Sequence, residues 1–338
     1  MNPLPAPNHG ATPPDPAAAS DAMPAGPAGS TSADPAGSAP DASPAQAEGS
    51  SNAGVLAAFF AFVAWGILPV FWKALVSVDP LEVLCHRILW SFAAVLPFMF
   101  FRGRLGGLKR FLGTRRNLLG LLASGCILAG NWYLYIWAIM SGMVVEASLG
   151  YYITPLVNIL FGIAIFREKA GPLVWLAIAV AAAAVMYRMG NLGHLPYVPL
   201  GLAFSFGIYG LLRKVLIVEA LPGMFMETLV VLPIAAAYLI YQAMHGHSAF
   251  FRHDLAIDAL LISSGLITTI PLICFAYGAR RIRMTTLGIL QYMTPTCVLL
   301  LGVLAYDEPF TRETAVTFIL IWTALALYTW NTLRRRQW

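Results

Sequence analysis

The sequence predicts an all-α membrane protein of ten transmembrane helices, built as two inverted five-helix repeats with both termini in the cytoplasm and a disordered N-terminal tail. Composition, a series of apolar segments and an internal repeat support this prediction. Hydrophobic residues make up 59% of the 338 and charged residues only 11%, against about 25% charged in a typical soluble domain. With a mean hydropathy of +0.71, the chain is excluded from the ordinary soluble class.

Apolar segments follow one another from residue 54 onward with short breaks between them. Each is close to the length of about 20 residues that a helix needs to cross a bilayer. Prolines start or interrupt several of them, and a proline inside a membrane helix frees a carbonyl that a neighbouring group must bind. The ten predicted spans are 54–72, 80–101, 117–140, 146–166, 171–189, 197–213, 222–243, 255–279, 284–305 and 311–333.

The first 52 residues have a different composition, dominated by Ala, Pro, Gly, Ser and Asp, with no Lys or Arg. Such a segment cannot bury enough apolar surface to offset its ordering entropy. It also lacks the basic region and apolar core of a signal peptide. We therefore predict a disordered cytoplasmic tail at 1–52, a first repeat at 53–190, a second at 196–333 and a basic C-terminal tail at 334–338.

Basic residues are distributed unevenly between the loops. The even-numbered loops and the C-terminus hold 16 of the 21 Lys and Arg residues. Positively charged loops remain on the cytoplasmic side of a membrane. The asymmetry therefore predicts a chain in the inner (plasma) membrane with both termini in the cytoplasm. An even number of spans is then required, and ten satisfies it.

The two halves share residues at a constant spacing. Tyr-x-Thr-Pro occurs at 152–155 and at 292–295, which lie 140 residues apart, and Glu168 and Glu308 have the same offset. Because five helices per half is an odd number, the second half must enter the membrane upside down relative to the first. Inverted repeats are typical of secondary transporters, in which two halves expose a midplane site to each side in turn. The alternative is an inverted-repeat scaffold without transport.

Several motifs resemble those of a known family. These are CHRILWSF (85–92), GNW (130–132), EASLGYY (146–152) and PLVN (155–158). Together they resemble the RarD-type permeases of the EamA family, within the drug/metabolite transporter superfamily, and the likeness extends over residues 53–333. The resemblance implies a ten-helix, exporter-like fold in the cytoplasmic membrane. It does not specify the substrate, because the superfamily moves amino acids, nucleotide sugars, amines and drugs.

The second predicted span carries the densest group of ionisable residues. Glu82 and His86 are four residues apart and therefore share a helix face, and Arg87 is adjacent. Ionisable groups within a membrane are costly and usually functional. We predict that His86 and Arg87 bind substrate or act in gating, and that Glu82 is a candidate for ion coupling. The alternative is a structural ion pair with a neighbouring helix, for which Glu146 is the candidate partner.

Two further groups of polar residues are candidates for substrate binding or gating. Asn131 and Tyr135 share a face of the third span, although interhelical hydrogen bonding explains them equally well. The repeated Tyr-x-Thr-Pro segments place polar groups near the middle of the fourth and ninth spans, where an inverted-repeat carrier would hold its substrate. The alternative there is a proline kink that serves packing alone. The candidates in this second group are Tyr152, Asn158, Gln291 and Tyr292.

Glu227 is a further acid within a predicted span, in the seventh segment. It is a candidate for ion coupling by a proton, and an ion pair with Arg213 or Lys214 is the competing interpretation. No nucleotide-binding G-x-x-x-x-G-K-[ST] loop is present, which argues against an ATP-driven pump. The four cysteines lie in apolar runs without a CxxC pair, so we predict no metal site.

These observations predict a secondary active transporter of the EamA and RarD type, not an enzyme, with no catalytic residues and no cofactor. It would move a small organic solute or drug across the cytoplasmic membrane, in the export direction by alternating access. The expected partners are the small-molecule substrate, the lipid bilayer and a second copy of the chain as a homodimer, but no nucleic acid. The alternatives are a membrane scaffold or sensor without transport, and a facilitator or exchanger for a metabolite.

Overall fold

A computed structural model describes residues 44–101, 115–167, 169–216, 220–252, 254–282 and 284–335. Most of the predicted tail, most cations of the second loop, Glu168 and residues 336–338 lie outside these ranges. The helices are α1 (Pro44–Lys73), α2 (Pro80–Phe101), α4 (Arg115–Met140), α5 (Val144–Phe166), α6 (Pro172–Leu192), α7 (Tyr197–Val215), α8 (Ala220–Met244), α9 (Leu255–Ala279), α10 (Met284–Leu290), α11 (Met293–Leu300), the π-helical turn η2 (Leu301–Ala305) and α12 (Arg312–Arg335).

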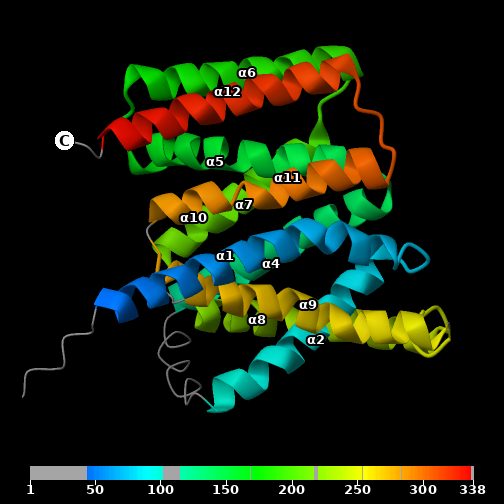
Figure 1. Ribbon diagram of the computed structural model, residues 1–338. Coiled ribbons are helices and arrows are strands. Elements are labelled where there is room, and N and C mark those ends of the chain that lie inside the picture. The colour runs from blue at the N-terminus through cyan, green and yellow to red at the C-terminus, as the bar shows by residue number, and fades with distance from the viewer. Residues whose placement is uncertain are drawn as a thin grey trace, which may run out of the picture. The chain divides into compact units, whose positions relative to one another are not determined.

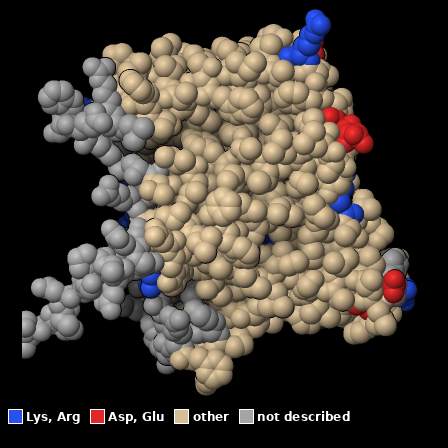
Figure 2. Space-filling model, viewed as in Figure 1, with Lys and Arg blue, Asp and Glu red and all other residues tan. Residues whose placement is uncertain are grey.

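The described part of the chain is all-helical, with no strands. Nine of its helices are long and apolar enough to cross a membrane, and a tenth, shorter apolar helix covers Met293–Ala305. Figure 2 shows an almost uncharged surface between two opposite sides, and acidic and basic side chains gather toward the right-hand side. This is the surface that a multi-pass membrane protein presents to lipid.

Helix α1 begins earlier than the predicted boundary of the tail. It starts at Pro44, although its membrane-length apolar segment begins only at Asn52. Proline suits the first turn of a helix, because its missing N–H would have no intrahelical acceptor there. Proline also starts α2 at Pro80, where the Asp79 carboxylate accepts hydrogen bonds from the backbone N–H groups of Leu81 (2.8 Å) and Glu82 (3.3 Å).

The ninth predicted span is a broken helix. It is divided into α10 and α11 by a turn at Gln291 and Tyr292, and its end is the π-helical turn η2. Pro295 follows this turn and cannot donate the hydrogen bond that would close the helix onto the Gln291 carbonyl. The equivalent Pro155 does not break α5, which runs continuously through it. The duplicated motif therefore has two different local structures.

Helix packing links the two halves of the sequence. Three contacts each occur in two equivalent forms. Helix α5 packs on α7 as α11 packs on α1, and α4 packs on α7 as α9 packs on α1. Helix α2 packs on α9 as α8 packs on α4. In addition α2 packs against α8, and α6 lies beside α12 (Figure 1). If every helix is exchanged for the helix at the corresponding place in the other half, each of these contacts becomes another contact of the same set or remains unchanged.

Some of these contacts depend on glycine. On α9, a Cβ atom added to Gly265 would lie 2.6 Å from the backbone nitrogen of Ser91 and closer still to the Trp90 carbonyl group. A Cβ at Gly125 on α4 would lie 2.8 Å from the Glu227 carbonyl oxygen. Small residues allow membrane helices to approach this closely. At these positions α9 packs backbone to backbone against α2, and α4 against α8.

Glu308, in the loop between η2 and α12, interacts with the first half. Its carboxylate oxygens accept hydrogen bonds from the backbone N–H groups of Val144 and Val145, each 2.8 Å long, at the start of α5. The start of a helix has unpaired N–H groups and a partial positive charge, so it favours a carboxylate. Burial raises the pKa of Glu308 above its ordinary value of 4.5, and the two N–H donors and Lys73 partly oppose that rise.

The raised pKa predicts how stability changes with pH. Because the folded protein holds the Glu308 proton more tightly than the unfolded chain does, this contribution is complete below the ordinary pKa and is lost as pH rises through the folded value. The melting temperature of the wild type should therefore fall relative to that of Glu308→Gln between about pH 4 and pH 7. Thermal unfolding in detergent measures this, with Asp307→Asn as the control. Parallel curves for wild type and Glu308→Gln would contradict the prediction.

Candidate functional site

Arg87 lies inside the helix bundle on α2, with 6% of its surface exposed. Its guanidinium carbon is 4.1 Å from the ring centroid of Trp132 on α4 and 5.3 Å from that of Trp72 on α1. Its Nε donates a 3.0 Å hydrogen bond to Thr268 Oγ1 on α9. Among the described residues no carboxylate lies within 4.0 Å of the guanidinium. Arg87 is thus a buried cation held by π-faces and a hydroxyl group.

Several polar atoms around Arg87 are buried and unpaired. Nη1 of Arg87, the hydroxyl group of Tyr135 and Nε1 of Trp72 make no hydrogen bond within the described part of the chain. Tyr135 and Tyr151 lie near the guanidinium, and their rings meet edge to face with centroids 5.5 Å apart. Each unpaired donor is costly when buried, so the cluster favours a ligand that offers acceptors. We call Trp72, Arg87, Trp132, Tyr135 and Tyr151 the arginine cluster.

On α2, His86 immediately precedes Arg87, and Glu82 lies one turn before His86. Glu82 is 2% exposed and accepts hydrogen bonds from Ser248 Oγ (2.9 Å) and the Ala249 backbone N–H (2.8 Å). His86 Nε2 lies 4.0 Å from Glu82 Oε1, and Trp90 Nε1 donates a 3.3 Å hydrogen bond to His86 Nδ1. Since Nδ1 accepts, the neutral imidazole carries its proton on Nε2. The pair connects α2 to the loop between α8 and α9.

Glu146, the candidate ion-pair partner of the second predicted span, has a different partner in the structure. Glu146 forms an ion pair with Arg188 of α6, whose Nη1 also donates to Thr314 Oγ1 at 3.0 Å. The alternative interpretation, an ion pair between the ionisable residues of α2 and Glu146, is therefore wrong. Arg188 lies on the helix that packs beside α12, and the apolar pattern of the sequence does not reveal this position.

Asn131 and Tyr135 have separate roles although they share a face of α4. Asn131 Nδ2 donates to the Leu202 carbonyl oxygen at 3.1 Å and to Ser205 Oγ at 2.8 Å, both on α7. These are interhelical hydrogen bonds of the kind that hold membrane helices together. Tyr135, by contrast, belongs to the arginine cluster.

The Tyr-x-Thr-Pro segments meet in space. The rings of Tyr152 and Tyr292 stack with centroids 6.4 Å apart and an interplanar angle of 16°. The Tyr152 hydroxyl group lies 2.7 Å from Thr296 Oγ1. Gln291 is exposed, and Asn158 is exposed on the side of α5 that lines a cavity between α5 and α7. The structure therefore brings the two tyrosines together but separates them from Asn158.

Glu227 on α8 is 1% exposed and has three polar neighbours. It accepts hydrogen bonds from Ser124 Oγ on α4 and from the Tyr209 hydroxyl group (3.3 Å) on α7. Arg213 Nη1 lies 3.6 Å from its Oε1. The predicted ion pair with Arg213 is present, and this pair joins three helices at the ends of α7 and α8.

Four residues of the arginine cluster and its support are not among the site residues that the sequence predicts: Trp72, Trp132, Tyr151 and Thr268. Trp72 reads as one apolar residue among many in α1, and Thr268 carries no charge that would mark it. The polar pair Thr268 and Thr269, separated from Pro271 by one residue, is the available signal. The described residues contain no group of three or more His, Cys, Asp or Glu side chains that could hold a metal ion.

Comparisons with known proteins identify the family. The EamA-like transporter family matches twice, at residues 52–188 and 197–330. RarD of Escherichia coli is 41% identical over 278 residues, which cover 82% of this chain and 94% of that protein. An uncharacterised transporter of Vibrio cholerae is 41% identical over 284 residues, covering 84% and 94%.

A solved crystal structure supports the same fold. It matches with a TM-score of 0.53 at 20% identity, over 81% of this chain and 96% of that one. The matches to the family and to its curated members extend over nearly all of the apolar part of the chain. The protein is a multi-pass membrane permease, and it belongs to the EamA-like transporter family.

Proposed function

We propose that this permease is a secondary active transporter that binds a small organic solute at the arginine cluster. The solute carries a carboxylate next to an aromatic or apolar body. The observation that carries the proposal is the buried guanidinium of Arg87, stacked on Trp132 and Trp72 without a carboxylate partner among the described residues.

The chemistry of this cluster favours an anionic group. A buried charge is stable only if it is paired and hydrogen-bonded, and Arg87 has one protein acceptor, Thr268, among the residues that the structure describes. A planar guanidinium matches a carboxylate with two parallel hydrogen bonds. The Tyr135 hydroxyl group and Trp72 Nε1 can donate to the same anion. The surrounding rings provide an apolar surface for the rest of the solute.

We further propose that transport proceeds by alternating access between two inverted halves, with both termini in the cytoplasm and export as the direction. Two family matches in tandem and the paired helix contacts support a duplicated architecture. The odd number of predicted spans in each half requires the inversion. Arg87, Trp72, Trp132 and Tyr151 come from the first half and Thr268 from the second, so the cluster lies where the halves meet.

Flux through the purified full-length protein in liposomes tests the proposal. The panel contains aromatic amino acids and their N-acetyl derivatives, amines and amphenicols, each with and without a pH gradient. We expect saturable flux for carboxylate-bearing members and accumulation when the gradient is applied. Saturable flux without gradient-driven accumulation would indicate a facilitator or exchanger. No protein-dependent flux of any member would favour a scaffold or sensor.

Glu227 is the proposed coupling acid. It is buried among Ser124, Tyr209 and Arg213, groups that can rearrange around a neutral or a charged carboxyl group. Glu227→Gln removes the titrating group and retains the shape. We expect this variant to keep flux down a solute gradient while losing its acceleration by a pH gradient. Glu146→Gln, which removes the partner of Arg188, is the matched control and should keep the acceleration. Unchanged coupling in Glu227→Gln would assign Glu227 a structural role.

A further inference from the structure

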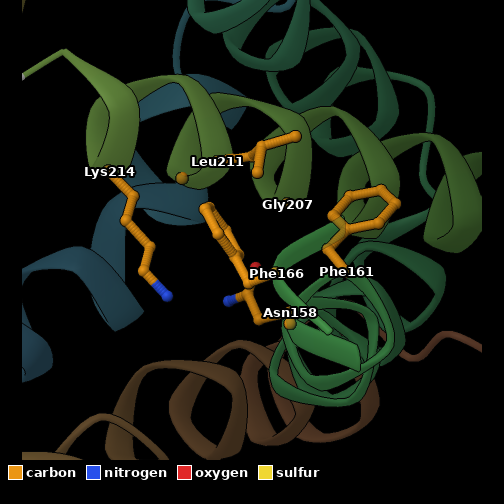
Figure 3. A pocket seen from close by; sticks show the side chains of 8 residues that line it. Asn158, Phe161, Phe166, Gly207, Leu211 and Lys214 are labelled. Atoms are coloured by element: carbon orange, nitrogen blue, oxygen red, sulfur yellow. The ribbon is translucent and has the colours of Figure 1, made fainter. Parts of the chain in front are cut away.

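A cavity of about 270 Å³ lies between α5 and α7, near the ends of both helices that carry Phe166 and Lys214. Figure 3 shows Asn158, Phe161 and Phe166 projecting from α5 toward α7, from which the Lys214 side chain extends. The Lys214 ammonium nitrogen lies 3.9 Å from the centroid of the Phe166 ring. The cavity therefore combines two aromatic side chains, one amide and one cation.

Two glycines of α7 have different relations to this cavity. A Cβ atom on Gly207 would lie 2.8 Å from Val157 and 3.0 Å from Phe161, so this glycine permits the close packing of α7 on α5. A Cβ on Gly210 would have the Asn158 amide oxygen, at 3.7 Å, as its only neighbour within 4 Å in the described structure. Gly210 thus borders open space, and a larger side chain there would occupy the cavity without displacing α5.

The cavity lies along the same helix face as part of the arginine cluster. Tyr151 and Asn158 are seven residues apart on α5, which is close to two full helical turns and about 10 Å along the axis. The Tyr151 ring meets the Tyr135 ring of the arginine cluster with centroids 5.5 Å apart, and Asn158 lines the cavity. One face of α5 therefore connects the two places.

We propose that this cavity is a second binding site for the carboxylate-bearing solute, which it receives before the solute reaches Arg87. Lys214 neutralises the carboxylate, the Asn158 amide hydrogen-bonds the polar part of the solute, and Phe161 and Phe166 contact its apolar body. The site faces the cytoplasm in the proposed orientation. This assignment of the substrate class rests on the proposed function, whereas occupancy of the cavity can be measured without transport.

A cysteine at Gly210 reports on the cavity. The background replaces Cys85 with alanine and Cys126, Cys274 and Cys297 with serine, so Gly210→Cys is the single thiol. A membrane-impermeant maleimide is applied to inside-out vesicles and to intact cells. The probe ligand is N-acetyl-L-phenylalanine, and its neutral amide is the matched control compound. Gly190→Cys on α6, where an added Cβ meets nothing within 4 Å, is the control position; it lies at the periplasmic side in the proposed orientation and is labelled in intact cells.

We expect Gly210→Cys to be labelled in inside-out vesicles and not in intact cells. The carboxylate should slow labelling about tenfold at saturation, while the amide has no effect. Lys214→Gln should remove this protection and Lys214→Arg should retain it. Protection that also slows labelling at Gly190→Cys, equal protection by the amide, or no protection at all would overturn the proposal.

Arg87→Gln separates this inference from the proposed function. Protection at Gly210→Cys should persist in the Arg87→Gln background, because the cavity has its own cation. If the protein transports nothing but protection persists, the proposed function fails and the second site stands. If transport is carboxylate-selective but Lys214→Gln has no effect on protection, the second site fails and the arginine cluster stands.

Discussion

Replacing Arg87 with glutamine is expected to reduce carboxylate flux by roughly 100-fold, because it removes the only charge that the buried cluster offers to the solute. Arg87→Lys keeps the charge but loses the planar fork and the stacking on Trp132 and Trp72. We expect it to retain flux at an intermediate level, with a raised KM. Initial rates in proteoliposomes, normalised to the inserted protein, measure both effects.

Arg281→Gln is the matched control for the arginine substitutions. Arg281 also lies over an aromatic ring, 3.6 Å from the centroid of Tyr277, but it is exposed. The variant should transport at the wild-type rate. Wild-type flux in Arg87→Gln would remove the arginine cluster from the substrate path. Equal loss of flux in Arg281→Gln would show that the assay responds to arginine removal in general.

Gly265→Ala is expected to cause a large loss of stability for the addition of a single methyl group. The added Cβ would overlap the backbone of α2 at Trp90 and Ser91, which cannot move as a side-chain end can. Overpacking of this kind costs about 3 kcal/mol, which outweighs the gain of about 1 kcal/mol from replacing glycine in a helix. We expect a clearly lower melting temperature and a smaller folded fraction on size-exclusion chromatography.

Gly130→Ala on α4 is the corresponding control. An added Cβ there meets nothing within 4 Å, so the helix propensity of alanine should leave the stability unchanged or slightly raised. A melting temperature for Gly265→Ala equal to that for Gly130→Ala would contradict the close backbone packing of α2 and α9. Since Thr268 is one turn further along α9, loss of this packing should also weaken the support of Arg87.

Much of the fold can be predicted from the sequence because apolar length and proline position are local properties. The starts of α2 and α9 follow from Asp79 and Asp254, whose side chains accept hydrogen bonds from the first turns. The break before Pro295 is harder to predict, because the same Tyr-x-Thr-Pro motif continues as an unbroken helix around Pro155. Helix packing decides between these outcomes: Thr294 donates to the Phe62 carbonyl of α1, whereas Thr154 donates to Gly150 of its own helix.

The candidate site is less predictable than the fold. Charge within a membrane segment directs attention to Arg87, Glu82 and Glu227, all of which are buried, because burying a charged group is costly. Their partners are on other helices and are mostly uncharged, such as Trp72, Thr268 and Ser124. Sequence spacing carries no information about such contacts between helices, so Glu146 was matched with the wrong partner.

The most direct test of the central claim is solute counterflow in proteoliposomes with N-acetyl-L-phenylalanine and its neutral amide. The two compounds differ at the group that Arg87 is proposed to bind. Vesicles loaded with the unlabelled carboxylate should take up the labelled carboxylate transiently in the wild type, and should not do so in Arg87→Gln. The labelled amide should enter at the rate of protein-free liposomes. Protein-dependent counterflow of the amide at the carboxylate's rate, or undiminished counterflow in Arg87→Gln, would contradict carboxylate recognition by the arginine cluster.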